Sequence, residues 1–338
     1  MLKGHQSWIF ENKPVIRSTA TVVGPFEGRG PLANDFDIIH GDSMLQEESW
    51  EKAENVLIEE AAKLAIENAG LTKEQVQFYI GGDLMNQIIS SSFAARTLTI
   101  PYIGVFGACS TSMESLALAA NLVNSGSAKF VLAGTCSHDS SVEKQFRYPT
   151  EYGSQKPPTA QFTVTGAGAA VVSTDGDGPV VTSATIGRVI DMGIKDPFNM
   201  GAAMAPAAVD TIQAHFRDLE IEPGYYDLIV TGDLAKIGYE IACKLFKKHN
   251  FPIDQTEYSD CGMMIYDYET QKVQAGASGC GCSAVVTYGH LLKRIRKGEL
   301  KRILVVATGA LLSPISFQQG ESIPCIAHAV SIEAGRSL

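Results

Sequence analysis

The sequence has no apolar stretch long enough to cross a membrane as a helix. No run reaches the ~18 consecutive apolar residues that a spanning helix requires. Residues 1–6 also lack the apolar segment of a secretory signal. The seven cysteines are odd in number, and Cys280 and Cys282, the one close pair, have no second pair or histidine at zinc-site spacing. We therefore expect synthesis and folding in the reducing cytoplasm, with no disulfide framework and no zinc site.

Positive charge is also scarce. The 338 residues contain 27 Lys and Arg against 37 Asp and Glu, a net charge of −10. This balance argues against non-specific binding to nucleic acid, and no arginine-rich or aromatic-basic run points to it. The glycines of residues 165–172 lack the G-x-G-x-x-G spacing of a nucleotide loop. What remains is a core-rich globular chain with 45% hydrophobic and 19% charged residues.

The most informative stretch surrounds Cys109. Small residues, Gly107 and Ala108, allow a tight turn, and residues 110–123 predict a helix with one acid and no Lys or Arg. Such a helix is expected to be buried on most sides. A cysteine just before a helix N-terminus is predicted to have a lowered thiol pKa, because the helix dipole stabilises the thiolate. A reactive thiol and an inert packing cysteine are both open at this point.

Strand and helix patterns alternate along the chain, which predicts parallel or mixed sheets covered by helices. A turn-rich loop is expected over 26–43, and the turn at 175–179 is the expected boundary between halves 1–178 and 179–338. Strands are predicted over 15–23, 76–80, 102–106 and 129–134, and helices over 49–69 and 110–123.

The second half repeats the first. Gly82-Asp83 and Gly232-Asp233 each follow a short apolar strand, 150 positions apart, whereas residues 126–132 match 298–304 at 172 positions. Because the second spacing is larger than the first, the second half is predicted to contain a hairpin-like insertion near 254–273. A repeat of half the chain indicates a pseudo-twofold fold, in which two central helices pack together and the loops at the strand ends converge on one pocket.

Residues 107–110, 166–172 and 298–312 together resemble the thiolase superfamily, in particular the ketoacyl-acyl-carrier-protein synthase III branch. This resemblance implies a five-layered αβαβα fold of two pseudo-repeated halves, with an acylated cysteine at Cys109. The branch completes its site with a histidine in a Pro-His-Gln-Ala-Asn loop and an asparagine in a Gly-Asn-Thr-Ser turn. Here the matching loop, 231–235, has no histidine, and the matching turn, 279–282, has no asparagine.

The missing residues matter for chemistry. Condensation needs donors that stabilise an oxyanion, and a cysteine nucleophile normally needs a base or a cationic partner. His138 and His290 are the candidate substitutes, but nothing in the sequence places either at the thiol. His290 lies mid-helix beside two leucines, where packing or surface exposure is expected.

A closer resemblance is to the thiolase-like stage V sporulation proteins of endospore-forming bacteria, carried by residues 8–10, 15–25, 81–87 and 107–114. It implies non-catalytic binding of dipicolinic acid (pyridine-2,6-dicarboxylate) during spore formation and germination. It also implies a peripheral position on the spore inner membrane beside the membrane proteins of the dipicolinate channel. We expect a homodimer, no cofactor and no metal site, with calcium accompanying the ligand left open. An acyl-transferring enzyme that uses Cys109, and a purely structural subunit, are the alternatives.

Candidate ligand-binding residues follow from position. Helix N-termini at Cys109 and near Cys282 are expected to offer N–H groups to a carboxylate. Asp83 ends a strand after two glycines. Its carboxylate would accept a proton from a ligand carboxyl, accept a hydrogen bond from a ligand donor, or ligate calcium, and a turn or capping role is an equal alternative. Basic side chains in nearby loops would pair with carboxylates, and tyrosines would stack on the ring. The full set is Asp83, Cys109, Asp233, Arg147, Tyr148 and His138, with Arg96, Tyr152 and Lys156 as further loop candidates.

Overall fold

Two five-stranded groups with the same strand arrangement lie side by side in the sheet of the computed structural model, which describes residues 1–146 and 156–335. The first group runs in the order β3 (Val15–Val23), β9 (Gly166–Ser173), β7 (Phe130–Ser137), β5 (Phe78–Gly82) and β6 (Tyr102–Gly104). The second runs β10 (Val180–Thr185), β15 (Cys325–Glu333), β14 (Arg302–Ala310), β11 (Leu228–Thr231) and β12 (Glu257–Asp260). The groups meet where Val180 of β10 pairs with Val15 of β3.

The pairing pattern confirms the internal repeat. In the first group β3–β9 and β9–β7 are antiparallel, and β7–β5 and β5–β6 are parallel. The second group follows the same sequence, with antiparallel β10–β15 and β15–β14 and parallel β14–β11 and β11–β12. Each of the five strands of one group therefore has a counterpart in the other group.

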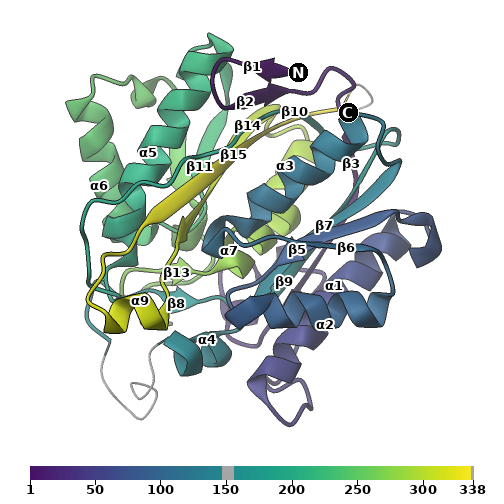
Figure 1. Cartoon of the computed structure of the whole chain (residues 1–338), viewed down its shortest axis with the longest axis horizontal. Helices are drawn as coiled ribbons and strands as arrows, with labels where there is room; N and C mark the ends of the chain where they lie inside the picture. The colour runs from purple at the N-terminus through teal and green to yellow at the C-terminus, as the bar shows by residue number, and fades with distance from the viewer. Residues whose placement is uncertain (147–155, 336–338) are drawn as a thin grey trace.

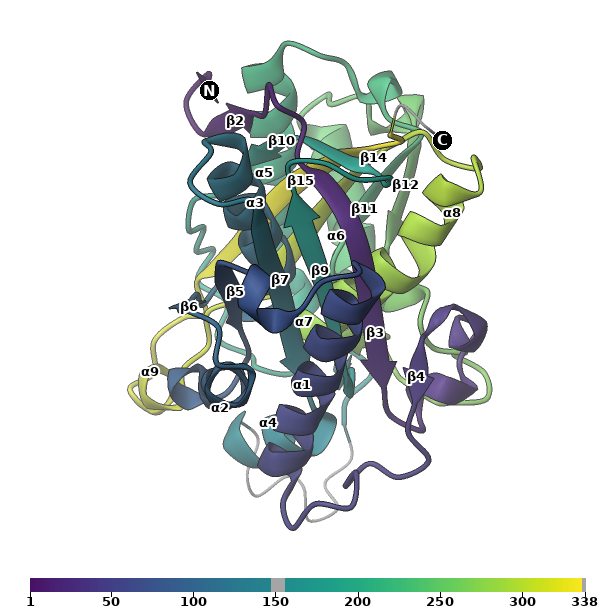
Figure 2. The same ribbon diagram turned by 90° about the vertical axis from the view of Figure 1, so that its right-hand side faces the viewer.

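Helices and strand groups form five layers (Figures 1 and 2). Helices α1 (Trp50–Asn68) and α2 (Ile89–Leu98) cover one outer face, and α5 (Met200–Leu219) and α6 (Ala235–Lys248) cover the other. Between the two strand groups lie α3 (Thr111–Asn124) and α7 (Cys280–Val285), which contact each other and share the largest apolar core. This arrangement is the predicted αβαβα fold, and the apolar character of the central helix follows from its burial on most sides.

Short elements complete the described chain. Strand β1 (Leu2–Lys3) pairs with β2 (Ser7–Ile9), and β2 pairs with β10, so the N-terminus contacts the second half. Strand β4 (Ile38–Ile39) pairs with β3, and β8 (Phe162–Thr163) pairs with β13 (Ala277–Ser278) in a separate two-stranded sheet. The remaining helices are α4 (Asp139–Phe146), α8 (Leu292–Arg296) and α9 (Pro314–Gln318). Among the helices of residues 1–146 and 156–335, none combines the length and apolarity needed to cross a bilayer.

The hairpin-like insertion predicted near 254–273 is wrong in part. Residues 257–260 form β12, the counterpart of β6, which pairs in parallel with β11 and has no returning strand. The extra length of the second half follows β12, in the segment 261–276 that leads to β13 and α7. The chain passes between the halves near residues 174–179, and their division into domains at 178 and 179 stays a prediction.

Candidate functional site

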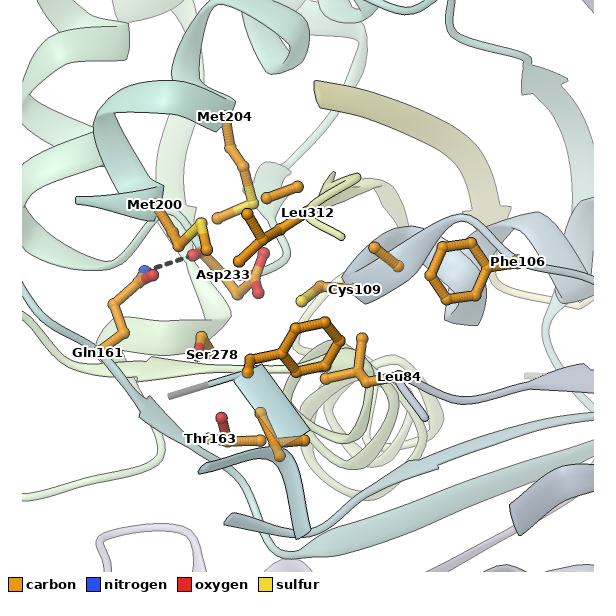
Figure 3. A pocket seen from close by; sticks show the side chains of 14 residues that line it. Leu84, Phe106, Cys109, Gln161, Thr163, Met200, Met204, Asp233, Ser278 and Leu312 are labelled. Carbon is orange, nitrogen blue, oxygen red and sulfur yellow. Dashed lines mark hydrogen bonds between the residues drawn. The ribbon is translucent and has the colours of Figure 1, made fainter. Parts of the chain in front are cut away.

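Loops at the strand ends of both halves enclose a narrow, mostly apolar cavity of about 60 Å³, with Cys109 and Asp233 facing into it (Figure 3). An outer cleft of about 360 Å³ adjoins it and shares Leu84, Phe106, Phe146 and Leu312 with it. The polar residues of the inner lining are Cys109, Gln161, Thr163, Asp233 and Ser278. Both halves therefore contribute to one site, as the repeat predicts.

The turn that carries Cys109 is built from short-range hydrogen bonds. Ser110 Oγ donates to Gly107 O at 2.6 Å, and Thr111 Oγ1 donates to Ala108 O at 2.7 Å. Ala108 has a positive φ of 51°, an uncommon backbone conformation for a residue with a side chain. Strand β14 contacts this turn through Gly309, where a Cβ atom would lie only 2.1 Å from the carbonyl oxygen of Gly107. Glycine at 309 is therefore required for this close approach.

The predicted lowering of the Cys109 thiol pKa is wrong. Burial is the largest effect and raises the pKa of the thiol well above its usual value, and the neighbouring Asp233 carboxyl raises it further. The residue is only partly exposed, and this partial removal of the thiol from water, together with the adjacent acid, outweighs the helix N-terminus. Cys109 is thus predominantly a neutral thiol at neutral pH.

Asp233 follows β11 and is buried. Thr308 Oγ1 donates to Asp233 Oδ1 at 2.6 Å, and the Gly279 N–H donates to Oδ2 at 3.0 Å. Gln161 Nε2 donates to the Asp233 backbone carbonyl at 2.7 Å, which ties the loop to β8 (Figure 3). Burial raises the pKa of this carboxyl to about 7, although the hydrogen bonds oppose the shift.

Asp83, its counterpart in the first half, is oriented differently. The Met85 N–H donates to Asp83 Oδ1 at 2.8 Å and the Ser91 N–H donates to Oδ2 at 2.7 Å. The side chain is fully buried and does not line the cavity, whereas its neighbour Leu84 does. Burial raises the pKa of Asp83 to about 6. This geometry matches the capping alternative, because the carboxyl holds the start of α2.

The other sequence candidates lie apart from the thiol. His138 Nδ1 accepts from the Ser140 N–H at 3.2 Å, so Nε2 carries the proton and donates to Ser43 O at 2.8 Å. Burial lowers the pKa of His138, which is absent from the cavity lining. His290 Nδ1 contacts Asp35 Oδ2 at 2.6 Å. Arg147, Tyr148 and Tyr152 lie outside the described residues.

Two basic candidates have other contacts. Lys156 Nζ lies 3.0 Å from a carboxylate oxygen of Glu143 and 3.9 Å from one of Asp139. The Arg96 guanidinium lies 4.4 Å from the centre of the Phe93 ring on α2. Neither residue lines the inner cavity.

The turn before α7 does not present its N–H groups as expected. The Gly279 N–H donates to Asp233, the Gly281 N–H donates to Ser137 Oγ at 3.1 Å, and the Cys282 N–H donates to Gly279 O at 3.0 Å. The Cys280 thiol donates to Cys136 O at 2.9 Å. These donors are used inside the protein, so this helix start offers little to a ligand.

Sequence reasoning missed Gln161, Thr163 and Ser278. Thr163 and Ser278 reach the cavity because β8 pairs with β13, in register at these two residues. A two-residue parallel pairing between segments far apart in the sequence leaves no local pattern. The apolar walls, including Phe106, Met200 and Leu312, were equally invisible, since apolar residues at strand ends resemble ordinary core residues.

Solved structures with the same fold include 3-oxoacyl-[acyl-carrier-protein] synthases III, OleA and a 3-ketoacyl-CoA thiolase. A variant of OleA from Xanthomonas campestris matches with a TM-score of 0.64 and 14% identity, covering 96% of this chain and 97% of its own. The 3-oxoacyl-[acyl-carrier-protein] synthase III of Aquifex aeolicus matches at 0.55 and 16%, covering 95% and 99%. Human mitochondrial 3-ketoacyl-CoA thiolase matches at 0.56 and 12%, covering 96% and 99%. These matches establish the thiolase-like fold.

Sequence comparison gives a narrower assignment. The family model described as "Stage V sporulation protein AD" matches residues 4–333. A curated stage V sporulation protein AD of Bacillus subtilis (strain 168) is 50% identical over 332 residues, which cover 98% of each chain. Because both matches span nearly the whole sequence, the chain belongs to the stage V sporulation protein AD family.

Proposed function

We propose that this protein binds dipicolinic acid without catalysing a reaction, and thereby aids the movement of this acid into and out of the bacterial spore. Family membership assigns the chain a role in sporulation. The observation that supports the proposal is the nature of the side chain next to the Cys109 thiol. The thiol lies beside the buried carboxyl of Asp233, and the inner lining contains no histidine, lysine or arginine among the described residues.

This neighbour argues against nucleophilic catalysis. A thiol becomes a nucleophile as the thiolate, which requires a base or a nearby positive charge. Burial and Asp233 instead raise the pKa of Cys109. The turn that matches the asparagine of the condensing enzymes carries Cys280, whose thiol donates to a backbone carbonyl and not into the cavity. The inner lining therefore lacks the histidine and asparagine of the condensing enzymes, and among the described residues the acid beside the thiol is Asp233.

The shape and lining suit a small, flat acid. Phe106, Phe146 and Leu312 form apolar walls, on which an aromatic ring packs well. Thr163 and Ser278 bring hydroxyl donors to the same cavity. Arg147 and Tyr148 follow Phe146 directly in the sequence, and our prediction that they contact the ligand's carboxylate and ring stands on that position.

Calcium, the assembly and the location complete the proposal. In the described part of the chain no group of three or more His, Cys, Asp or Glu side chains is arranged to hold a metal ion. Calcium as a companion of the ligand is part of the proposal that titrations with and without calcium test. We propose a homodimer, peripheral on the spore inner membrane, next to the membrane proteins of the dipicolinate channel. These features rest on the family resemblance.

Calorimetric titration with dipicolinic acid, with and without calcium, tests the proposal. We expect saturable binding of one ligand per chain. Leu312→Trp fills the inner cavity and is expected to weaken binding at least tenfold, whereas Ile315→Trp, on the exposed face of α9, is the matched control. Absence of binding to the wild type, together with a mass gain on Cys109 after incubation with acyl-CoA, would establish the acyl-transfer alternative. That alternative is favoured only by the position of Cys109 in the cavity.

A further inference from the structure

The charged and titratable groups around Asp233 are all acids or thiols. They come from five different elements, so the environment does not depend on one loop. In the part of the chain that the structure describes, the groups that act electrostatically on Asp233 are Cys109, Asp260, Cys261, Cys280, Cys282 and Cys325. None of these groups carries a positive charge.

An anion cannot enter this cavity at low cost while Asp233 is ionised. Two like charges a few ångströms apart repel strongly where water is excluded. Asp233 is 1% exposed and has no described cationic neighbour that could offset a second negative charge. The carboxyl also retains hydrogen-bonding capacity, because it accepts from Thr308, from Gly279 and from the Cys109 thiol, fewer than the roughly four bonds that two carboxylate oxygens can accept.

We propose that Asp233 recognises the ligand as a carboxylic acid: it takes up one proton from solvent when the anion binds, and its O–H donates a hydrogen bond to a carboxylate of the ligand. This inference rests on the proposed function and deepens it. One O–H bond forms on Asp233, the proton comes from water or buffer, and no bond of the ligand breaks. Ligand binding is thereby coupled to proton uptake, so the protein holds its ligand more tightly as the pH falls.

The number of protons taken up on binding is expected from the pKa of Asp233 in the ligand-free protein. Burial raises the pKa of Asp233 to about 7, so the group is mostly ionised at pH 8 and mostly protonated at pH 6. Binding at pH 8 is therefore expected to take up close to one proton, and binding at pH 6 only a small fraction of one. Above pH 7 the affinity is expected to fall about tenfold per pH unit.

Calorimetry in buffers of different ionisation enthalpy measures the number of protons directly. Dipicolinate would be titrated without calcium at pH 6 and pH 8. Asp233→Asn keeps a neutral donor at this position, and we expect it to bind with no proton uptake and little pH dependence. Glu114→Gln is the matched control, because burial also raises the pKa of Glu114 to about 7 but its side chain lies outside this cavity. It is expected to leave the proton uptake unchanged.

The outcomes separate this inference from the proposed function. Saturable binding by the wild type with no proton uptake at pH 8 overturns the coupling and leaves dipicolinate binding intact. No binding at either pH overturns both proposals. If Asp233→Asn does not fold, Asp233→Ser serves as the non-ionising variant, because persistence of proton uptake in Glu114→Gln excludes only Glu114 as its source.

Discussion

Replacing Asp233 by Asn should change the free energy of unfolding of the ligand-free protein. The difference in stability between variant and wild type should shift in favour of the variant as the pH rises from 5 to 8. The pKa of Asp233 is raised from 3.8 to about 7 in the folded state, so folding loses stability as the pH rises from the lower value to the higher one. With 1.36 kcal/mol per pKa unit, the loss is about 4 kcal/mol at pH 8 and about 1.5 kcal/mol at pH 5. Asn cannot ionise, so the difference between variant and wild type should grow by about 2.5 kcal/mol over this range.

A constant offset accompanies this pH-dependent difference. Asn retains an oxygen for Thr308 but turns an NH₂ group toward the Gly279 N–H, which costs about 1 kcal/mol at every pH. The change with pH in the stability difference between variant and wild type therefore tests the raised pKa of Asp233. For a chain of 338 residues, 2.5 kcal/mol corresponds to about 3–4 °C in Tm.

Thermal melts of both proteins at pH 5, 6.5 and 8 provide the assay. Asp254→Asn, at an exposed position, is the matched control for the removal of one carboxylate. If the Tm difference between Asp233→Asn and wild type is the same at pH 5 and pH 8, Asp233 is not a buried group that ionises near neutrality. The reasoning about the site would then fail at its central residue.

Two further predictions concern the turn at Cys109. At pH 8, iodoacetamide should label Cys109 roughly tenfold more slowly than Cys243, the other partly exposed cysteine among those described, because burial raises the pKa of both thiols but burial and Asp233 together raise that of Cys109 further. Peptide mass spectrometry follows both sites in one sample, and equal rates would contradict the raised pKa. Gly309→Ala should lower Tm and abolish ligand binding, since its Cβ would meet the Gly107 carbonyl at 2.1 Å, whereas Gly41→Ala, with open space around it, should do neither. Unchanged binding in Gly309→Ala would show that the turn is not held by this contact.

Long, periodic segments could be predicted from the sequence. The strand over 15–23 has its predicted bounds, and the helices predicted over 49–69 and 110–123 lie within one or two residues of α1 and α3. Their patterns are local, because one face packs on a core along the whole element. The thiol pKa could not be predicted in this way. The helix terminus is visible next to Cys109, but Asp233 is more than a hundred residues away and reverses its effect.

The two aspartates related by the repeat have different surroundings, and the sheet register explains why. Gly81 of β5 pairs with Gly104 of β6, and at the corresponding position Thr231 of β11 pairs with Asp260 of β12. Glycine offers no side chain, so in the first half the loop after β5 has only Asp83 to accept its N–H groups.

In the second half, Asp260 accepts the hydrogen bonds from the corresponding loop. Its carboxylate accepts from the N–H groups of Leu234 and Ala235 and from Thr231 Oγ1. Asp233 is thereby released from its own loop and faces the cavity beside Cys109. The two halves differ, among other positions, at Gly104 and Asp260. Where glycine stands, Asp83 caps its own loop, and where Asp260 stands, Asp233 faces the cavity.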